Sequence, residues 1–210
     1  MTVIPIMIEL EGKRAVVVGG GRIAKRKLSG LLDSGAELTV ISPVAVPEIA
    51  EWAEEGKINW KQKNFEPTDA EDAFMLVIAT DDPAVNAEAR KAASPHCLVN
   101  ASAEAEAGNI HFPAHVKRGK LSIAVSTNGA SPMLAKKIKQ ELQSQFDESY
   151  ERYLEFLFEA RQLLKKTQIP QNKKEEYLRG FLDEPFLQTA LQQETLRELR
   201  LLVNRKKDLE

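Results

Sequence analysis

Three consecutive glycines, Gly19, Gly20 and Gly21, follow an apolar run at residues 15–18 and precede a segment with helical spacing. Together with Ala24 they give the pattern G-x-G-x-x-A. In a strand-turn-helix unit the first glycine permits the tight turn and the second lets the backbone approach a pyrophosphate, while the helix N-terminus offers unpaired N–H groups. The sequence therefore predicts a dinucleotide-binding site on Gly19 and Gly21, with a simple chain reversal as the alternative.

The second predicted strand, at residues 38–41, ends without the acidic residue that usually binds the adenosine ribose. Ser42, Pro43 and Val44 stand there instead, and the Ser42 hydroxyl is our candidate for contacting the ribose. Because neither a carboxylate nor an arginine is present, the residues alone do not distinguish NAD from NADP.

Polar residues also follow two later predicted strands. Thr80 comes after the apolar run at residues 75–79, at the edge where ligands meet an open α/β sheet, so we expect it to contact the nicotinamide half of the cofactor. Ser126 ends the strand predicted at residues 121–125. A polar residue at such a position either contacts a ligand or caps the following turn, here at Asn128.

The histidines predict no metal site. Pro113 lies between His111 and His115, which precludes a helical ligand pair, and no H-E-x-x-H pattern is present. His111 lies where the chain leaves the predicted sheet and is a candidate for lining the substrate cleft, with a surface histidine as the alternative. Cys97 is the lone cysteine, which excludes an intramolecular disulfide, and its apolar neighbours predict a small buried hydrophobe.

Composition and charge limit the class of protein. The chain has 210 residues, of which 43% are hydrophobic and 29% charged, and its formal net charge is −2. This is ordinary globular composition, without a global attraction to nucleic acid or to an anionic membrane. The apolar residues 3–8 are too few, and wrongly flanked, for a signal peptide or a membrane span. We expect a cytoplasmic protein with no nucleic-acid or membrane partner.

Strand and helix patterns alternate up to about residue 112, which predicts an α/β fold with a Rossmann-like, doubly wound parallel sheet. Residues 3–10 are expected to form a strand. We predict an NAD-binding domain at residues 1–112, a dimerisation or connecting region at 113–145 and an all-helical C-terminal domain at 146–210.

Helices dominate after Ser131 and Pro132, which suit the N-cap and the first position of a helix. Residues 168–174 are predicted to be a loop, and a further helix is expected from about residue 184 to 204. One helical face carries an apolar stripe that should pack on the nucleotide domain or on a second chain: Tyr150, Tyr153, Leu154 and Leu157.

Several of these segments together resemble one family. They are V-V-V-G-G-G-R-I-A-K-R-K at residues 16–27, G-A-E-L-T-V-I-S-P at 35–43, A-T-D-D at 79–82 and V-S-T-N-G-A-S-P at 125–132. The chain resembles the precorrin-2 dehydrogenase family, which also forms the N-terminal part of multifunctional siroheme synthases. The resemblance implies oxidation of precorrin-2, a tetrapyrrole, to sirohydrochlorin with NAD as hydride acceptor. It also implies a homodimer formed by the elements after the nucleotide domain.

The resemblance also implies roles for single residues. Carried over by position, it assigns cofactor contacts to Arg22, Ile23, Pro43 and Val44. It favours a ligand role for Ser126. Since the implied substrate carries many carboxylates, Asn128 in the adjoining loop and Lys136 in a nearby lysine-rich run are candidates for substrate binding.

One position departs from the family pattern. The family often carries N-V-x-D after the fifth strand, with the aspartate proposed to act in dehydrogenation and chelation, whereas this chain has Ala103 at that position. The neighbouring Glu104 is a candidate proton acceptor, so Ser126 and Glu104 are the candidate catalytic residues. A reaction that needs positioning more than a base would tolerate the alanine. Two alternatives remain: a bifunctional dehydrogenase and ferrochelatase, and a dinucleotide-sensing module without catalysis.

Overall fold

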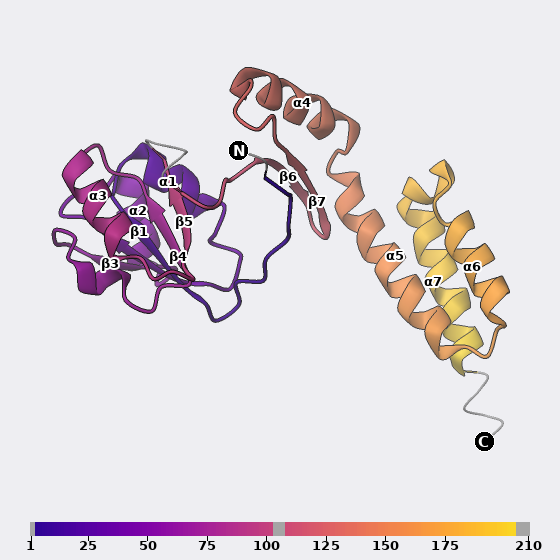
Figure 1. The fold of residues 1–210 in the computed structure, drawn as a ribbon. Helices are drawn as coiled ribbons and strands as arrows, with labels where there is room; N and C mark the ends of the chain where they lie inside the picture. Colours follow the sequence, from indigo (N-terminus) through magenta and orange to yellow (C-terminus); the bar gives the residue numbers. More distant parts are fainter. Residues whose placement is uncertain (1–2, 103–107, 205–210) are drawn as a thin grey trace. The chain divides into compact units, whose positions relative to one another are not determined.

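The computed structural model describes residues 3–102 and 108–204 of the chain (Figure 1). The chain divides into two compact units. The first contains Ile6–Phe112, and the second contains Pro113–Glu210 together with Met1–Pro5.

The first unit is built on a five-stranded sheet in the order β3-β2-β1-β4-β5, in which every neighbouring pair is parallel. Its strands are β1 Arg14–Val18, β2 Glu37–Ile41, β3 Asn59–Lys61, β4 Met75–Ile78 and β5 Leu98–Ala101. β-branched and aliphatic residues fill the central strands because both faces of a parallel sheet are covered. The order reverses at β1, which has β2 on one side and β4 on the other. This is the doubly wound fold that the alternation of strands and helices predicts.

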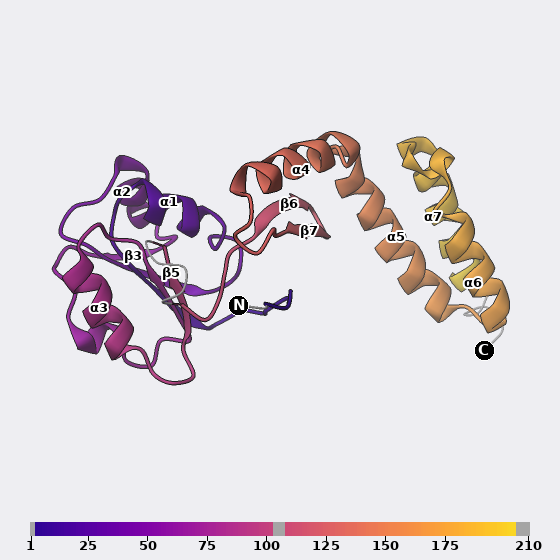
Figure 2. The same cartoon turned by 45° about the horizontal axis from the view of Figure 1, so that its top comes forward.

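Helices cover both faces of this sheet (Figure 2). Helices α1 (Arg22–Ser29) and α2 (Pro47–Glu54) contribute to the core on one face, and α3 (Pro83–Ala92) with the 3-10 helix η1 (Pro67–Ala70) contributes to the core on the other. Successive residues of β1 alternate between the two cores, with Val17 in the first and Val16 in the second. The period of two in an extended strand thus fixes which side chains each layer of helices covers.

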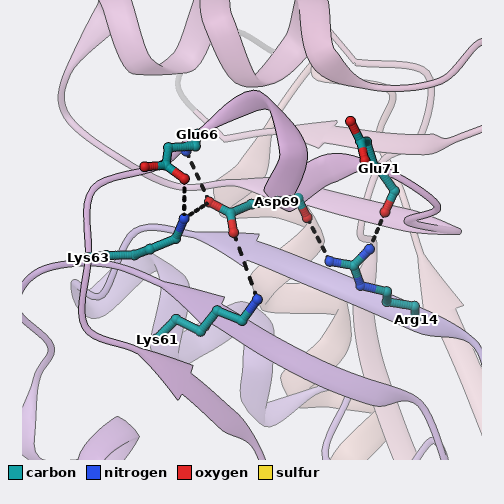
Figure 3. A network of polar contacts seen from close by, with 6 residues as sticks. All are labelled: Arg14, Lys61, Lys63, Glu66, Asp69 and Glu71. Carbon is teal, nitrogen blue, oxygen red and sulfur yellow. Dashed lines mark hydrogen bonds and ion pairs between the residues drawn. The ribbon is translucent and has the colours of Figure 1, made fainter.

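A buried carboxylate anchors η1. The Asp69 side chain is 4% exposed, accepts a hydrogen bond from the Glu66 N–H at 3.0 Å and forms an ion pair with Lys63 at 3.0 Å. The Arg14 guanidinium of β1 donates to the Asp69 carbonyl at 2.9 Å, so the 3-10 helix is tied to the sheet by its backbone as well. The complete network joins Arg14, Lys61, Lys63, Glu66, Asp69 and Glu71 (Figure 3).

The second unit begins with an antiparallel pair, β6 (Ala114–Arg118) and β7 (Leu121–Val125), which α4 (Pro132–Gln145) contacts. Its remaining elements are α5 Ser149–Lys166, α6 Gln171–Gly180, the 3-10 helix η3 Glu184–Leu187 and α7 Thr189–Asn204. Ser131 caps α4 and Pro132 opens it, as predicted. Among the described helices, none combines the length and the apolarity needed to cross a membrane.

Three expectations for the secondary structure are wrong. Residues 3–10 form no strand, since an extended segment needs a neighbouring strand to pair its backbone groups and the described chain places none beside it; Ile4 is 78% exposed. Strand β6 was not expected, since only Val116 in it is buried and its polar residues hide the pattern. The predicted loop at 168–174 instead contains the start of α6, because Pro170 immediately precedes the helix and does not interrupt it.

The apolar stripe of α5 also packs differently from the prediction. Tyr153 and Phe156 are buried in a core that includes Phe181 and Leu199, and Tyr150, Leu154 and Leu157 pack against the same core. The Tyr153 hydroxyl donates to the Phe181 carbonyl at 2.8 Å. The stripe is therefore covered by α6, α7 and the segment between them within its own unit.

Replacing Asp69 by alanine should lower the free energy of unfolding by about 1–3 kcal/mol, because the Glu66 N–H and Lys63 lose a buried acceptor. Urea denaturation of the full chain measures the loss. Glu71→Ala is the matched control, since Arg14 contacts only the backbone carbonyl of Glu71. We expect that control to change the free energy of unfolding by less than about 0.5 kcal/mol. Equal losses in the two variants would contradict the anchoring role of Asp69.

Candidate functional site

The glycine turn lies where the ends of β1, β2 and β4 meet. Gly19 has φ +113°, and a Cβ on it would lie 2.4 Å from the Ala79 carbonyl oxygen, so only glycine fits. Its N–H donates to the Ile41 carbonyl at 2.9 Å. The turn is therefore held between β2 and β4, at the crevice where doubly wound sheets bind their ligands.

Gly20 has a packing role that the pattern G-x-G-x-x-A leaves unassigned. A Cβ on Gly20 would lie 2.2 Å from the Val44 carbonyl oxygen, and the Gly20 carbonyl accepts a hydrogen bond from the Val46 N–H at 2.9 Å. The middle glycine thus allows the loop after β2 to lie against the turn. The sequence signal for it is a third glycine at a position where the pattern accepts any residue.

Gly21 differs from both. It is exposed, and a Cβ built on it would meet nothing within 4 Å. It is the N-cap of α1, whose first turn has no side-chain cap and no acidic residue. Arg22 and Ile23, the next two residues, are exposed as well. An uncapped helix N-terminus with open space in front of it is a ready-made site for a phosphate group.

The loop after β2 presents apolar surface. The Ser42 hydroxyl is buried and donates to the Val44 carbonyl at 2.7 Å, while Trp60 Nε1 donates to the Ser42 carbonyl at 3.0 Å. Pro43 is exposed, and Val44 is 75% exposed. The hydrogen bond from Ser42 to Val44 thus stabilises the loop. A ribose hydroxyl could therefore donate to the Ser42 oxygen, or Ser42 would have to give up its bond to Val44 in order to donate to the ribose.

Thr80 follows β4 beside the glycine turn, since its N atom lies 3.1 Å from the position of a Cβ on Gly19. Its hydroxyl donates to Asn86 Oδ1 at 2.7 Å, and Asn86 Nδ2 donates back to the Thr80 carbonyl at 3.2 Å. The Asp82 side chain accepts hydrogen bonds from the N–H groups of Ala84 and Val85. Asp82 is thus the N-cap of α3.

Asn100 at the end of β5 is a polar residue that the sequence analysis did not select. It is buried, its Nδ2 donates to the Ile110 carbonyl at 2.9 Å, and its Oδ1 has no hydrogen-bond partner in the described chain. Ala103 and Glu104 lie outside the described residues. His111 is exposed and belongs to the same unit.

The remaining candidates belong to the second unit, around the start of α4. The Ser126 hydroxyl accepts a hydrogen bond from the Asn128 N–H at 3.1 Å and lies 3.2 Å from Asn128 Oδ1. Thr127 Oγ1 and the backbone of Ser131 exchange hydrogen bonds of 3.1 and 3.2 Å, which closes the loop. Ser126, Asn128 and Lys136 are all exposed. The structure thus groups Ser126 with Asn128, and it uses both in the turn.

Burial and neighbouring positive charge lower the pKa of one basic side chain in each unit, Lys27 in the first and His115 in the second. Lys27 Nζ lies 4.6 Å from the centroid of the Phe112 ring, and burial, with Arg26 beside it, lowers the pKa of this lysine. Burial and the charges of Lys117 and Lys139 lower the pKa of His115, whose Nε2 lies 2.8 Å from Ser122 Oγ.

Within residues 3–102 and 108–204, no three side chains of His, Cys, Asp or Glu are grouped so as to hold a metal ion.

Family models match three parts of the chain. Residues 6–114 match the model of an NAD(P)-binding family, residues 118–145 that of the central region of sirohaem biosynthesis proteins, and residues 150–196 that of the SirC C-terminal domain.

Individual proteins are similar over nearly the whole chain. The precorrin-2 dehydrogenase of Priestia megaterium is 40% identical over 195 residues, which covers 92% of this chain and 96% of that protein. The precorrin-2 dehydrogenase of Bacillus subtilis (strain 168) is 40% identical over 158 residues, 75% of this chain and 98% of that protein. A solved structure named SirC, precorrin-2 dehydrogenase, has a TM-score of 0.82 at 38% identity, covering 94% of this chain and 99% of that one.

Gly21→Asp should weaken NAD binding by about 100-fold or more, roughly 2.7 kcal/mol, because it places a carboxylate where a phosphate would bind. The fold should be kept, since Gly21 has room for a side chain and aspartate is a favoured N-cap residue. Calorimetry measures the affinity and thermal unfolding measures the fold.

Gly20→Ala is the matched comparison for that variant. Its Cβ would collide with the Val44 carbonyl, so we expect a loss of stability of about 1–3 kcal/mol. A folded Gly21→Asp variant with unchanged NAD affinity would refute the assignment of the phosphate site.

Proposed function

The chain belongs to the precorrin-2 dehydrogenase family, and we propose that it oxidises precorrin-2 to sirohydrochlorin in siroheme biosynthesis, with NAD as the hydride acceptor. The observation that carries this beyond family membership is the glycine turn. It combines an uncapped α1 N-terminus with open space at Gly21, at the crevice between β1 and β4.

The residues of the first unit fit a dinucleotide. The backbone at Gly21 and the first turn of α1 would hold the pyrophosphate, with Arg22 and Ile23 beside it. The exposed Pro43 and Val44 would pack against the adenosine, and Thr80 would contact the nicotinamide half. When bound, the cofactor would accept a hydride from the macrocycle, the proton lost with it would pass to water, and the chain's own residues would supply binding and orientation.

We propose NAD over NADP. A 2′-phosphate needs a cation near the end of β2, where the chain has Ser42, Pro43 and Val44. The two lysines at and just after the end of the neighbouring β3, Lys61 and Lys63, both form ion pairs with Asp69. The loop therefore offers apolar surface and no unpaired cation of its own to a ribose phosphate.

We also propose a cytoplasmic homodimer. Two structural features support pairing with a second copy: the exposed apolar residues of the N-terminal segment, among them Ile4, Ile6 and Met7, and a β6–β7 pair that has only two strands. Helix α4 packs on this pair, but the outer edges of β6 and β7 pair with no strand of the described chain, so strands added by a partner would satisfy their unpaired backbone groups.

An anaerobic assay with precorrin-2 tests the function. We expect stoichiometric formation of sirohydrochlorin and NADH, with kcat/KM at least about tenfold higher for NAD than for NADP, which is about 1.4 kcal/mol of discrimination. Iron added after oxidation should enter the product no faster than it does without protein. Dinucleotide binding without turnover would favour the sensing module, and metal insertion above the spontaneous rate would favour the bifunctional enzyme.

Glu104→Gln tests whether the family's aspartate has been replaced. We propose that positioning suffices, so the change should alter kcat by less than about twofold, whereas loss of a general base would lower it by about 10² or more. Ser126→Ala should instead raise the KM for precorrin-2 by about 3- to 10-fold, through loss of a hydrogen bond to the substrate. A hundredfold drop in kcat for Glu104→Gln, with NAD affinity unchanged, would make Glu104 the proton acceptor.

A further inference from the structure

Two apolar side chains are exposed at the start of α4. Met133 is 84% exposed and Leu134 is 48% exposed. Both come directly after the loop that contains Ser126 and Asn128. Exposed hydrophobic residues are common, but this pair lies next to a loop proposed to bind substrate, where an apolar ligand would cover it.

The geometry of the helix directs this pair toward the loop. In an α-helix the Cα–Cβ bonds tilt toward the N-terminus, so side chains of the first turn lean over the residues that precede the helix. Those residues are fixed, because Thr127 and Ser131 hydrogen-bond to each other and the Ser131 hydroxyl accepts from the Leu134 N–H at 3.2 Å. The apolar pair therefore belongs to the helix end that borders the polar loop.

Positive charge adjoins the pair. Lys136 and Lys137 are exposed and lie three and four positions after Met133, on the neighbouring turn of the same helix. The first turn of α4 contains no acidic residue, and among the described residues Lys137 forms one long ion pair, with Glu141 at 3.9 Å. An apolar platform bordered by cations matches a flat macrocycle that has apolar faces and carboxylates around its rim.

We propose that Met133 and Leu134 form a platform on which one face of the tetrapyrrole packs, while Lys136 and Lys137 bind carboxylates at its rim. This inference rests on the proposed function and deepens it. It assigns recognition of the ring face to the start of α4, so that the apolar pair sets the affinity for the macrocycle and the glycine turn sets the affinity for the dinucleotide.

Met133→Gln, Leu134→Gln and the double variant test the platform in the full chain. Each single change should raise the KM for precorrin-2 by about tenfold, as expected when most of a buried aliphatic side chain is lost from an interface. The Kd of NAD, measured by calorimetry, should not change. Met133→Leu should keep the wild-type KM, since leucine conserves apolar volume.

Leu182→Gln is the matched control, because Leu182 is 64% exposed in the same unit and follows α6. We expect no change of KM in that variant. Light scattering on every variant separates the proposed platform from an interface between copies. A fall to half the wild-type mass in Met133→Gln, or an unchanged KM in the double variant, would overturn the proposal.

Titration of sirohydrochlorin without NAD, followed by absorbance, separates failure of the platform from failure of the proposed function. If the wild type binds sirohydrochlorin but does not turn over precorrin-2, the proposed function fails, and the same titration of Met133→Gln still decides the platform by whether the Kd rises about tenfold. If the wild type neither binds nor oxidises a tetrapyrrole, both are overturned.

Discussion

A Cβ atom on Gly19 would lie 2.4 Å from the Ala79 carbonyl oxygen, and one on Gly20 would lie 2.2 Å from that of Val44. No side chain fits in either space, so the first unit can bring the ends of β1, β2 and β4 together only with bare backbone at these two positions. The start of α1 and the loop after β2 both follow from this close approach. Hydrogen bonds from Gly19 to Ile41 and from Val46 to Gly20 fix the contact on both sides.

Within the same turn, Gly19 and Gly20 are required by packing, whereas Gly21 is explained by a ligand. Gly21 has open space around its Cβ position, so packing does not require a glycine there, whereas close approach of a pyrophosphate does. The Ser42 hydroxyl shapes the neighbouring loop and leaves Val44 on the surface. Backbone N–H groups and apolar contacts therefore dominate the proposed cofactor site, and few side-chain types are needed to specify it.

Sequence patterns predict the parts of this chain that are determined by local burial. The runs in β1, β2 and β4 are buried on both faces, so their β-branched and aliphatic composition is visible without a structure. Strand β6 has one buried residue, Val116, and its pattern of single apolar and polar residues matches a loop equally well. Helix α6 was hidden because Pro170 fits either a loop or the residue before a helix. The roles of Gly20 and Asn100 depend on contacts with residues far away in the sequence, which no local pattern contains.

The loop proposed to bind substrate in the second unit is held by side-chain hydrogen bonds, and this bears on the missing aspartate. The Ser126 hydroxyl bonds to the side-chain oxygen and the backbone N–H of Asn128, and Thr127 Oγ1 bonds to the backbone of Ser131, so the loop keeps its shape without help from a ligand. A preformed loop loses little conformational entropy when a large ring binds to it. More of the binding free energy then serves to orient the ring. Hydride transfer to a bound nicotinamide depends mainly on such orientation, because the cofactor accepts the electron pair and the oxidised macrocycle gains conjugation. An alanine at position 103 is compatible with this chemistry, since rigid positioning, and not a particular acid, then supplies what the reaction needs.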